Sequence, residues 1–104
     1  MEYTVIETFV AKENSQLFSM YARIKDLLEQ NQKYIEDKLG KDYKSVEVYP
    51  HKRKKFHCPT NCGNTYIWIK RIYVSLDNES QILEALCAKA DCGEPFLIYQ
   101  RRDL

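Results

Sequence analysis

The chain carries four cysteines in two close pairs, and each pair is followed immediately by a glycine. Glycine readily adopts the positive-φ conformations that a tight turn after a metal-binding sulfur often needs. Two of the three glycines in the chain, Gly63 and Gly93, stand at these places. The pattern C-x3-C-x24-C-x4-C therefore predicts a tetrahedral zinc site. The predicted ligands are Cys58, Cys62, Cys87 and Cys92.

Other states of these cysteines are also compatible with the pattern. The pairs could form disulfides, or the thiols could be buried and unlinked, as Cys87 would be beside Leu83 and Leu86 on a helix. His57 could replace one sulfur, although a histidine next to lysines is typical of an exposed segment. A redox-active dithiol is disfavoured because both spacings exceed C-x-x-C.

Length and the first residues indicate the class and compartment of the protein. A chain of 104 residues corresponds to about one small domain, for which a structural metal is a useful supplement to a modest core. The N-terminal residues lack the basic start and long apolar stretch of a secretory signal, so we expect a cytoplasmic protein. Reducing conditions there favour metal ligands over disulfides. No apolar run reaches the roughly 20 residues of a membrane span.

Hydrophobic periodicity predicts a strand, a helix and a second strand in the first half of the chain. Residues 3–10 and 43–50 are rich in strand-forming side chains. Between them, apolar residues recur every three or four positions over residues 14–39, with Asn14 or Ser15 as a cap and a glycine at position 40 as the C-cap. We expect this amphipathic helix to pack its apolar stripe on its own sheet. The spacing is also nearly heptad, which would allow a homodimer through residues 14–39.

The second half is predicted to be rich in β-structure. Residues 65–76 are β-branched and aromatic and predict a strand, bent by a bulge near Lys70. A turn follows at residues 77–80, and a last strand is expected at 96–100. Residues 81–90 fit either a helix or a returning strand of a hairpin, and propensity favours the helix.

These elements together predict an α+β protein. A strand, a long amphipathic helix and a strand would form residues 1–50. A basic linker and a zinc-clipped, β-rich module would form residues 51–104. The alternative is that the two parts pack as one compact domain.

The positive charge is concentrated around the first cysteine pair. Residues 51–71 contain six basic side chains and no acidic one, whereas acidic residues are in excess on both sides. Aromatic rings interleave with these charges, a composition typical of a nucleic-acid contact, although a solvated linker would look the same. The aromatic and imidazole rings are Tyr49, His51, Phe56, Tyr66 and Trp68. The candidate nucleic-acid-binding residues are Lys52, Arg53, Lys54, Lys55, Lys70 and Arg71.

The region from about residue 56 to residue 101 resembles a zinc ribbon, in which two cysteine pairs are joined by a β-hairpin. The segments CPTNCGN at 58–64 and CAKADCGEPF at 87–96 carry the resemblance. The second segment is similar to the closing knuckle of phage late-transcription activators of the Ogr and Delta type. The resemblance implies zinc on all four cysteines and a partner in the transcription machinery. The first knuckle departs from it by holding three residues between its cysteines, where ribbons usually hold two.

The sequence contains no phosphate-binding glycine loop and no nucleophile motif, so we predict that the protein is not an enzyme. A zinc ion with four sulfur ligands leaves no position for a reacting water. The predicted function is a small zinc-binding regulator that contacts nucleic acid or RNA polymerase-type machinery through its basic face. The alternative is a protein-binding inhibitor or adaptor of the phage or mobile-element kind, acting through its helix or its tyrosine-rich sheet.

Overall fold

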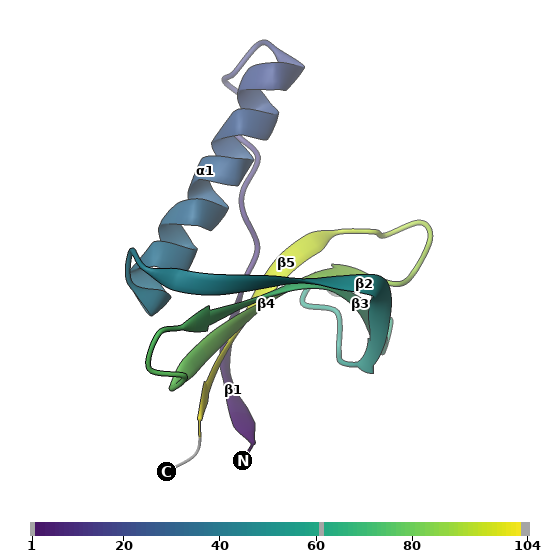
Figure 1. Ribbon diagram of the computed structural model, residues 1–104. Helices are drawn as coiled ribbons and strands as arrows, with labels where there is room; N and C mark the ends of the chain where they lie inside the picture. Colours follow the sequence, from purple (N-terminus) through teal and green to yellow (C-terminus); the bar gives the residue numbers. More distant parts are fainter. Residues whose placement is uncertain (1, 61, 103–104) are drawn as a thin grey trace.

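The protein folds around a single five-stranded antiparallel sheet with one helix, as seen in a computed structural model that describes residues 2–60 and 62–102 (Figure 1). The strand order is β1-β5-β4-β3-β2. Strands β2 to β5 form a meander, and β1 completes the other edge by pairing with β5. The elements are β1 (Tyr3–Phe9), α1 (Met20–Leu39), β2 (Tyr43–Lys55), β3 (Tyr66–Ser75), β4 (Ser80–Cys87) and β5 (Pro95–Arg102).

The predicted architecture, a strand–helix–strand unit followed by a zinc-clipped module, is wrong. All five strands belong to one sheet, in which the first strand pairs with the last: Phe9 lies opposite Leu97. Residues 51–55, expected to be a linker, form the second half of β2, which is continuous across residue 50. Hydrophobic periodicity identifies elements but not their partners, so pairing between distant strands could not be read from the sequence.

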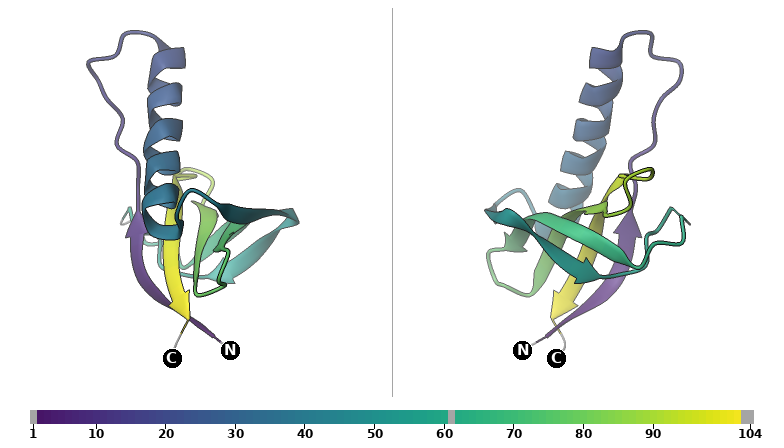
Figure 2. Two further views of the ribbon diagram at one scale, coloured as in Figure 1. Left: turned by 60° about the vertical axis from the view of Figure 1, so that its left-hand side comes forward. Right: turned by 90° about the vertical axis from the view of Figure 1, so that its right-hand side faces the viewer.

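Helix α1 is shorter than predicted, and its N-terminal half does not pack on the sheet. It begins after Ser19, whose hydroxyl accepts a hydrogen bond from the Ala22 backbone N–H, rather than at Asn14 or Ser15. It ends at Gly40, where φ is 88° and the backbone N–H donates to the Glu36 carbonyl. Only the C-terminal half contacts the sheet, and the other end of the helix projects beyond it (Figures 1 and 2).

The apolar stripe of α1 is therefore divided into a buried and an exposed part. Ile35 and Leu39, near its C-terminus, are buried against the sheet. The expected packing of the whole stripe on the sheet is wrong for the first half of the helix, which extends beyond the strands (Figure 1). The exposed apolar residues of that half are Met20, Tyr21, Ile24 and Leu28.

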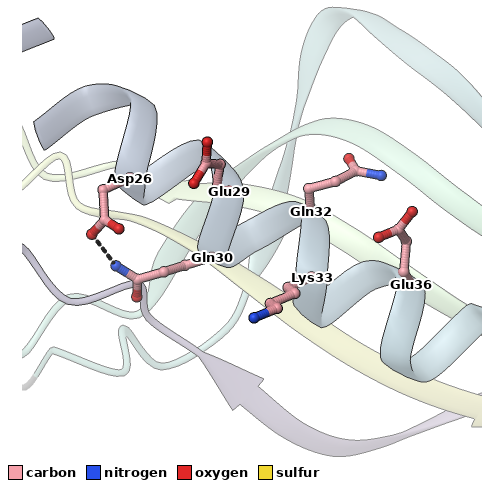
Figure 3. Close-up of a pocket in the computed structure, with 6 residues that line it drawn as sticks. All are labelled: Asp26, Glu29, Gln30, Gln32, Lys33 and Glu36. Atoms are coloured by element: carbon pink, nitrogen blue, oxygen red, sulfur yellow. Dashed lines mark hydrogen bonds between the residues drawn. The ribbon is translucent and has the colours of Figure 1, made fainter. Parts of the chain in front are cut away.

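The segment between β1 and α1 runs back along the helix and covers another of its sides (Figure 2). Gln30 clamps it by hydrogen bonding to both the backbone N–H and the carbonyl of Lys12. The Arg23 side chain donates to the Leu17 carbonyl at 2.7 Å. A polar face of α1 remains open, where Asp26 accepts a hydrogen bond from Gln30 and further charged residues line a shallow hollow (Figure 3). Every residue lining that hollow belongs to α1, so no second element helps to form a site there.

Residues 81–90 form a strand and a loop, so the preference for a helix there is wrong. Strand β4 is the middle strand of the sheet, and both of its faces are covered: Ile82 and Leu83, adjacent in sequence, are both buried. A strand buried on both sides loses the alternation that normally distinguishes it from a helix. The turn that precedes it, at residues 77–80, and the bulge near Lys70 in β3 are as predicted.

Two clusters form the core, one on each face of the sheet. Helix α1 covers the first cluster, in which Ile35 contacts the sheet residues Ile82 and Leu97. The second cluster lies in the concave face, where the sheet curls and the Phe56 ring stacks on the Phe96 ring at a centroid distance of 6.2 Å. This contact joins the end of β2 to the start of β5, two strands that are not neighbours in the sheet. The second cluster is Ile67, Ile69, Leu83, Ala85, Phe96 and Ile98.

A polar contact fixes the C-terminal half of α1 to strand β1. The Tyr34 hydroxyl donates to the Glu7 carboxylate at 2.7 Å, and the Lys38 ammonium lies 3.3 Å from the same group. These hydrogen bonds lower the pKa of Glu7 below its usual value. The Tyr34 ring also stacks on Phe9, so the helix is held by both apolar and polar contacts.

The part of the chain that the structure describes contains no helix long and apolar enough to cross a bilayer.

Candidate metal centre

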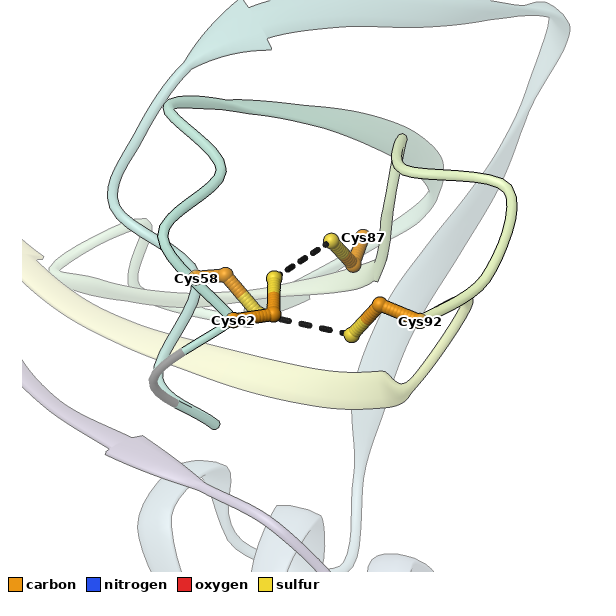
Figure 4. A group of neighbouring side chains, drawn as sticks. All are labelled: Cys58, Cys62, Cys87 and Cys92. Atoms are coloured by element: carbon orange, nitrogen blue, oxygen red, sulfur yellow. Dashed lines mark hydrogen bonds between the residues drawn. The ribbon is translucent and has the colours of Figure 1, made fainter.

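The four cysteines meet at one end of the sheet, where two loops lie side by side (Figure 4). The first loop joins β2 to β3 and carries Cys58 and Cys62. In the second, Cys87 is the last residue of β4 and Cys92 lies in the connection to β5. Because β3 and β4 are neighbours in the sheet, their pairing brings the two loops together: Ile67, near the start of β3, is directly opposite Cys87.

Backbone hydrogen bonds shape each loop into a tight knuckle. In the first, the Cys58 N–H donates to the Asn64 carbonyl at 3.0 Å. In the second, the Cys87 N–H donates to the Glu94 carbonyl at 3.1 Å. The glycines adopt the left-handed conformation expected of them, with φ of 82° at Gly63 and 55° at Gly93. The prediction that these glycines close the turns behind the second sulfur of each pair is confirmed.

The sulfur atoms have the separations that a tetrahedral metal site requires. All four lie within 4.8 Å of one another. The Cys62 and Cys87 sulfurs are 3.4 Å apart, and those of Cys58 and Cys92 are 3.9 Å apart. Zinc–sulfur bonds of about 2.3 Å in a regular tetrahedron place the sulfurs about 3.8 Å from each other. The predicted ligands are thus brought together in a group that can hold a metal ion.

The alternatives to a metal site fit this geometry less well. All four cysteines are free thiols, and their sulfurs are well beyond the roughly 2.05 Å of a disulfide bond. Cys87 lies on a strand rather than on a helix, and although it is buried its sulfur faces the other three. His57 is exposed and is not a member of the group.

Two polar side chains next to the cysteines extend the site, and the sequence analysis did not identify them. The Thr60 hydroxyl lies 2.9 Å from the Cys58 sulfur and 3.4 Å from the Cys92 sulfur, so it can donate to either thiolate across the two knuckles. The Asn64 side-chain amide donates to the Cys87 sulfur at 3.5 Å. Such contacts orient metal ligands and stabilise their charge. Thr60 lies between the two cysteines of the first pair and Asn64 lies two residues after the second of them. This proximity is the only sign of their role in the sequence.

Hydrogen bonds to the sulfurs of Cys58 and Cys92 favour the thiolate form of these two cysteines. Burial raises the pKa of Cys58, but hydrogen bonds from Thr60 and from neighbouring thiols outweigh this effect and lower the pKa to about 6. A hydrogen bond from Thr60 also lowers the pKa of Cys92. The Asn64 backbone N–H lowers the pKa of Cys62, but burial and the neighbouring cysteines raise it to about 12. Four thiolates this close repel one another, so a bound cation is needed for all four to be ionised together.

The donor set is suited to zinc. Four thiolate sulfurs in a tetrahedral arrangement are typical of structural zinc and of iron–sulfur sites. Among the described residues, no carboxylate or imidazole belongs to the group, and the exposed fractions of Cys58 and Cys87 are only 3% and 2%. A metal bound here would have only sulfur ligands and would link the β2–β3 loop to the β4–β5 loop. Its chemical role would be to fix these loops.

The predicted nucleic-acid-binding residues are distributed around the strands that lead into the first knuckle. Four of them lie consecutively on β2, which is an edge strand, and all four are exposed. The register shift in β3 falls at Lys70, and Arg71 lies between Glu47 of β2 and Glu84 of β4. Two carboxylates next to Arg71 reduce the positive potential at that position. The four consecutive residues are Lys52, Arg53, Lys54 and Lys55.

Comparisons with protein-family models, curated proteins and solved structures found no match for this chain. The resemblance to zinc ribbons and to Ogr-type activators therefore has no support beyond the cysteine group itself.

Proposed function

We propose that the protein is a small, non-enzymatic zinc protein of the reducing cytoplasm that contacts nucleic acid or transcription machinery through its basic strand. The four-sulfur group, with its two buried members, supports a structural rather than a catalytic metal. The order of knuckle, β3, β4, knuckle and β5 supports a zinc-ribbon-like centre. An activator-like role in transcription is proposed from the resemblance of the second knuckle.

The observation that carries the nucleic-acid part of the proposal is the position of the charges relative to the metal. Strand β2 ends at Lys55, only three residues before the first ligand, Cys58. The strand is exposed along residues 49–55 and contains no acidic side chain there. A metal that fixes the loop after β2 would hold these cations in place, and preorganised cations bind a polyanion at lower entropic cost.

The test is the salt dependence of oligonucleotide binding, measured by fluorescence anisotropy. Four exposed cations on β2, residues 52–55, are changed to alanine. The matched control changes four exposed lysines elsewhere, so that the net charge falls equally. We expect the β2 variant to bind at least about tenfold more weakly and its log K against log salt slope to flatten by up to about 3. The control lysines are Lys12, Lys25, Lys33 and Lys41.

Two results would contradict the proposal. One is the absence of binding to any oligonucleotide at low salt. The other is an equal loss of affinity in the two variants, which would show that only net charge matters and not the position of the charges on β2.

A second candidate function, contact with a protein, is favoured by the exposed half of α1. Leu28 is 63% exposed and Tyr21 is 77% exposed, and Phe18 just before the helix is fully exposed. Clustered apolar side chains of this size mark interaction sites on soluble proteins. We propose that this face binds a second copy of the chain, because Tyr21, Ile24, Leu28 and Asn31 follow the 3-4 spacing of a two-stranded coiled coil. An inhibitor or adaptor role would use the same face for another protein.

If the chain forms a homodimer, its mass measured by analytical ultracentrifugation should rise with protein concentration. Changing Ile24 to glutamate puts a charge in the centre of the helix face and should shift the protein to monomer. Changing Ile6 on β1 to glutamate is the control, because Ile6 and Ile24 are exposed to 52% and 50%. A wild-type protein that stays monomeric at high micromolar concentration would exclude self-association and leave the face for a different partner.

A further inference from the structure

We propose that the outer face of β2 and β3, beside the metal centre, is a stacking platform for single-stranded nucleic acid. In this proposal Tyr49 and Trp68 stack on unpaired bases, and Arg53 and Lys55 bind the phosphates between them. The proposal rests on the proposed function, since it names the class of nucleic acid and the residues that recognise it.

The register of the sheet places Trp68, Arg53 and Lys55 on one face. Arg53 lies opposite Trp68, and Lys55 lies opposite Tyr66. Directly opposed residues of antiparallel strands point to the same side of a sheet, and neighbours along a strand alternate. Cations and aromatic rings therefore share this face at the end of the sheet nearest the first knuckle.

The other two lysines of the strand lie on the opposite face. Lys52 is opposite Ile69, and Lys54 is opposite Ile67, which is completely buried in the concave core. The four consecutive cations are thus two pairs with different surroundings. Only the pair of Arg53 and Lys55 accompanies the aromatic rings.

A hollow next to this face can receive a flat ring. It has a volume of about 350 Å³ and is lined by Tyr49, Pro50, His51 and Trp68. Tyr49 is 88% exposed, so its ring is available to a ligand. No carboxylate lines the hollow, and an aromatic ring with a neighbouring cation is the usual contact for a nucleobase.

The remaining aromatic residues of the sequence motif have other roles. The Arg53 guanidinium lies over the Tyr66 ring at 4.1 Å, a contact that holds its planar group in place while its N–H donors stay free for phosphate. Tyr66 therefore positions Arg53. Phe56 is excluded from the platform because its ring stacks on Phe96 in the core.

Single strands fit this surface better than a duplex does. Stacking on a protein ring requires an unpaired base, since a duplex hides the faces of its bases. Many proteins that read a duplex place a basic helix in its major groove. The only helix that the described residues form, α1, carries equal numbers of basic and acidic side chains and lies away from β2's second half.

The test uses Trp68, the only tryptophan of the chain, as its reporter. Single-stranded 12-mers of thymidine or uridine nucleotides, and a duplex of the same length, are titrated into the zinc-loaded protein. We expect the single strands to quench the tryptophan fluorescence and to bind more tightly than the duplex. Tyr49→Leu should weaken single-strand binding by about 5- to 100-fold. Its control is Tyr21→Leu, at a tyrosine 77% exposed on the helix, which should leave binding unchanged when all proteins are held below the concentration at which the α1 face associates.

A second comparison separates stacking from charge. The double variants Arg53→Ala/Lys55→Ala and Lys52→Ala/Lys54→Ala lose the same net charge from opposite faces, and the first should lose more affinity. Equal binding of single strands and duplex, with no effect of Tyr49→Leu, would overturn the platform and leave the proposed function intact. No binding of either nucleic acid would overturn both, and the cations would then serve only to protect an edge strand from pairing with other chains.

Discussion

Changing Cys62 to serine is expected to remove the metal and to unfold the end of the sheet that carries the two knuckles. Cys62 is only half-buried, so the substitution removes a ligand without opening the core. Structural zinc in small modules is worth about 10 to 16 kcal/mol in apparent binding free energy. That is comparable to the whole net stability of a typical domain, roughly 5 to 15 kcal/mol. The loss should therefore appear as a large fall in the melting temperature.

The measurement has two parts and a matched control. Metal content by plasma emission spectroscopy should fall from one zinc per wild-type chain to a small fraction in the variant, and the thiols should titrate freely. Backbone hydrogen exchange should accelerate first in the β2–β3 and β4–β5 loops. Lys89→Ser, an exposed change in the second knuckle, should keep both metal and stability. A wild-type protein with no metal and four freely reacting thiols would remove the metal centre altogether.

The metal site could be predicted from the sequence because its signals are local. The spacing within each cysteine pair and the glycine that follows it are visible within a few residues. A zinc site then requires only that the two pairs come together in space. Convergence itself depends on β3 pairing with β4, which places Ile67 opposite Cys87. Thr60 could not be assigned a role, because its hydroxyl reaches Cys92 only across that pairing.

Individual helices and strands could be predicted from the sequence, but the pairing of the strands could not. Strands β1, β3 and β5 and the end of α1 at Gly40 have clear patterns, whereas β4 was obscured by burial on both faces. The pairing of β1 with β5 joins the two ends of the chain, and no local pattern encodes it. The same holds for the basic strand: the division of its four cations between two faces depends on the register with β3, including the shift between Glu47 and Lys52.

A second prediction with a large effect concerns Phe96, in the core cluster on the concave face of the sheet. Changing Phe96 to alanine should lower the free energy of unfolding by about 3 to 5 kcal/mol, because a large buried ring is replaced by a cavity. Phe96 is only 2% exposed and packs against Phe56, which directly follows the non-neighbouring strand β2. The measurement is urea unfolding of the zinc-loaded protein, followed by far-UV circular dichroism.

The chain supplies its own control for that experiment. Phe18 is fully exposed, so Phe18→Ala makes the same chemical change without loss of packing and should alter the free energy of unfolding by less than about 0.5 kcal/mol. The protein should be held below the concentration at which the α1 face associates, since Phe18 adjoins that face. Equal effects of the two substitutions would mean that the concave face is not a packed core. In that case the contact between Phe56 and Phe96 would not hold the end of β2 over β5, and the first knuckle would be held by the metal and by the contacts of Thr60 and Asn64 with the cysteines of the second knuckle.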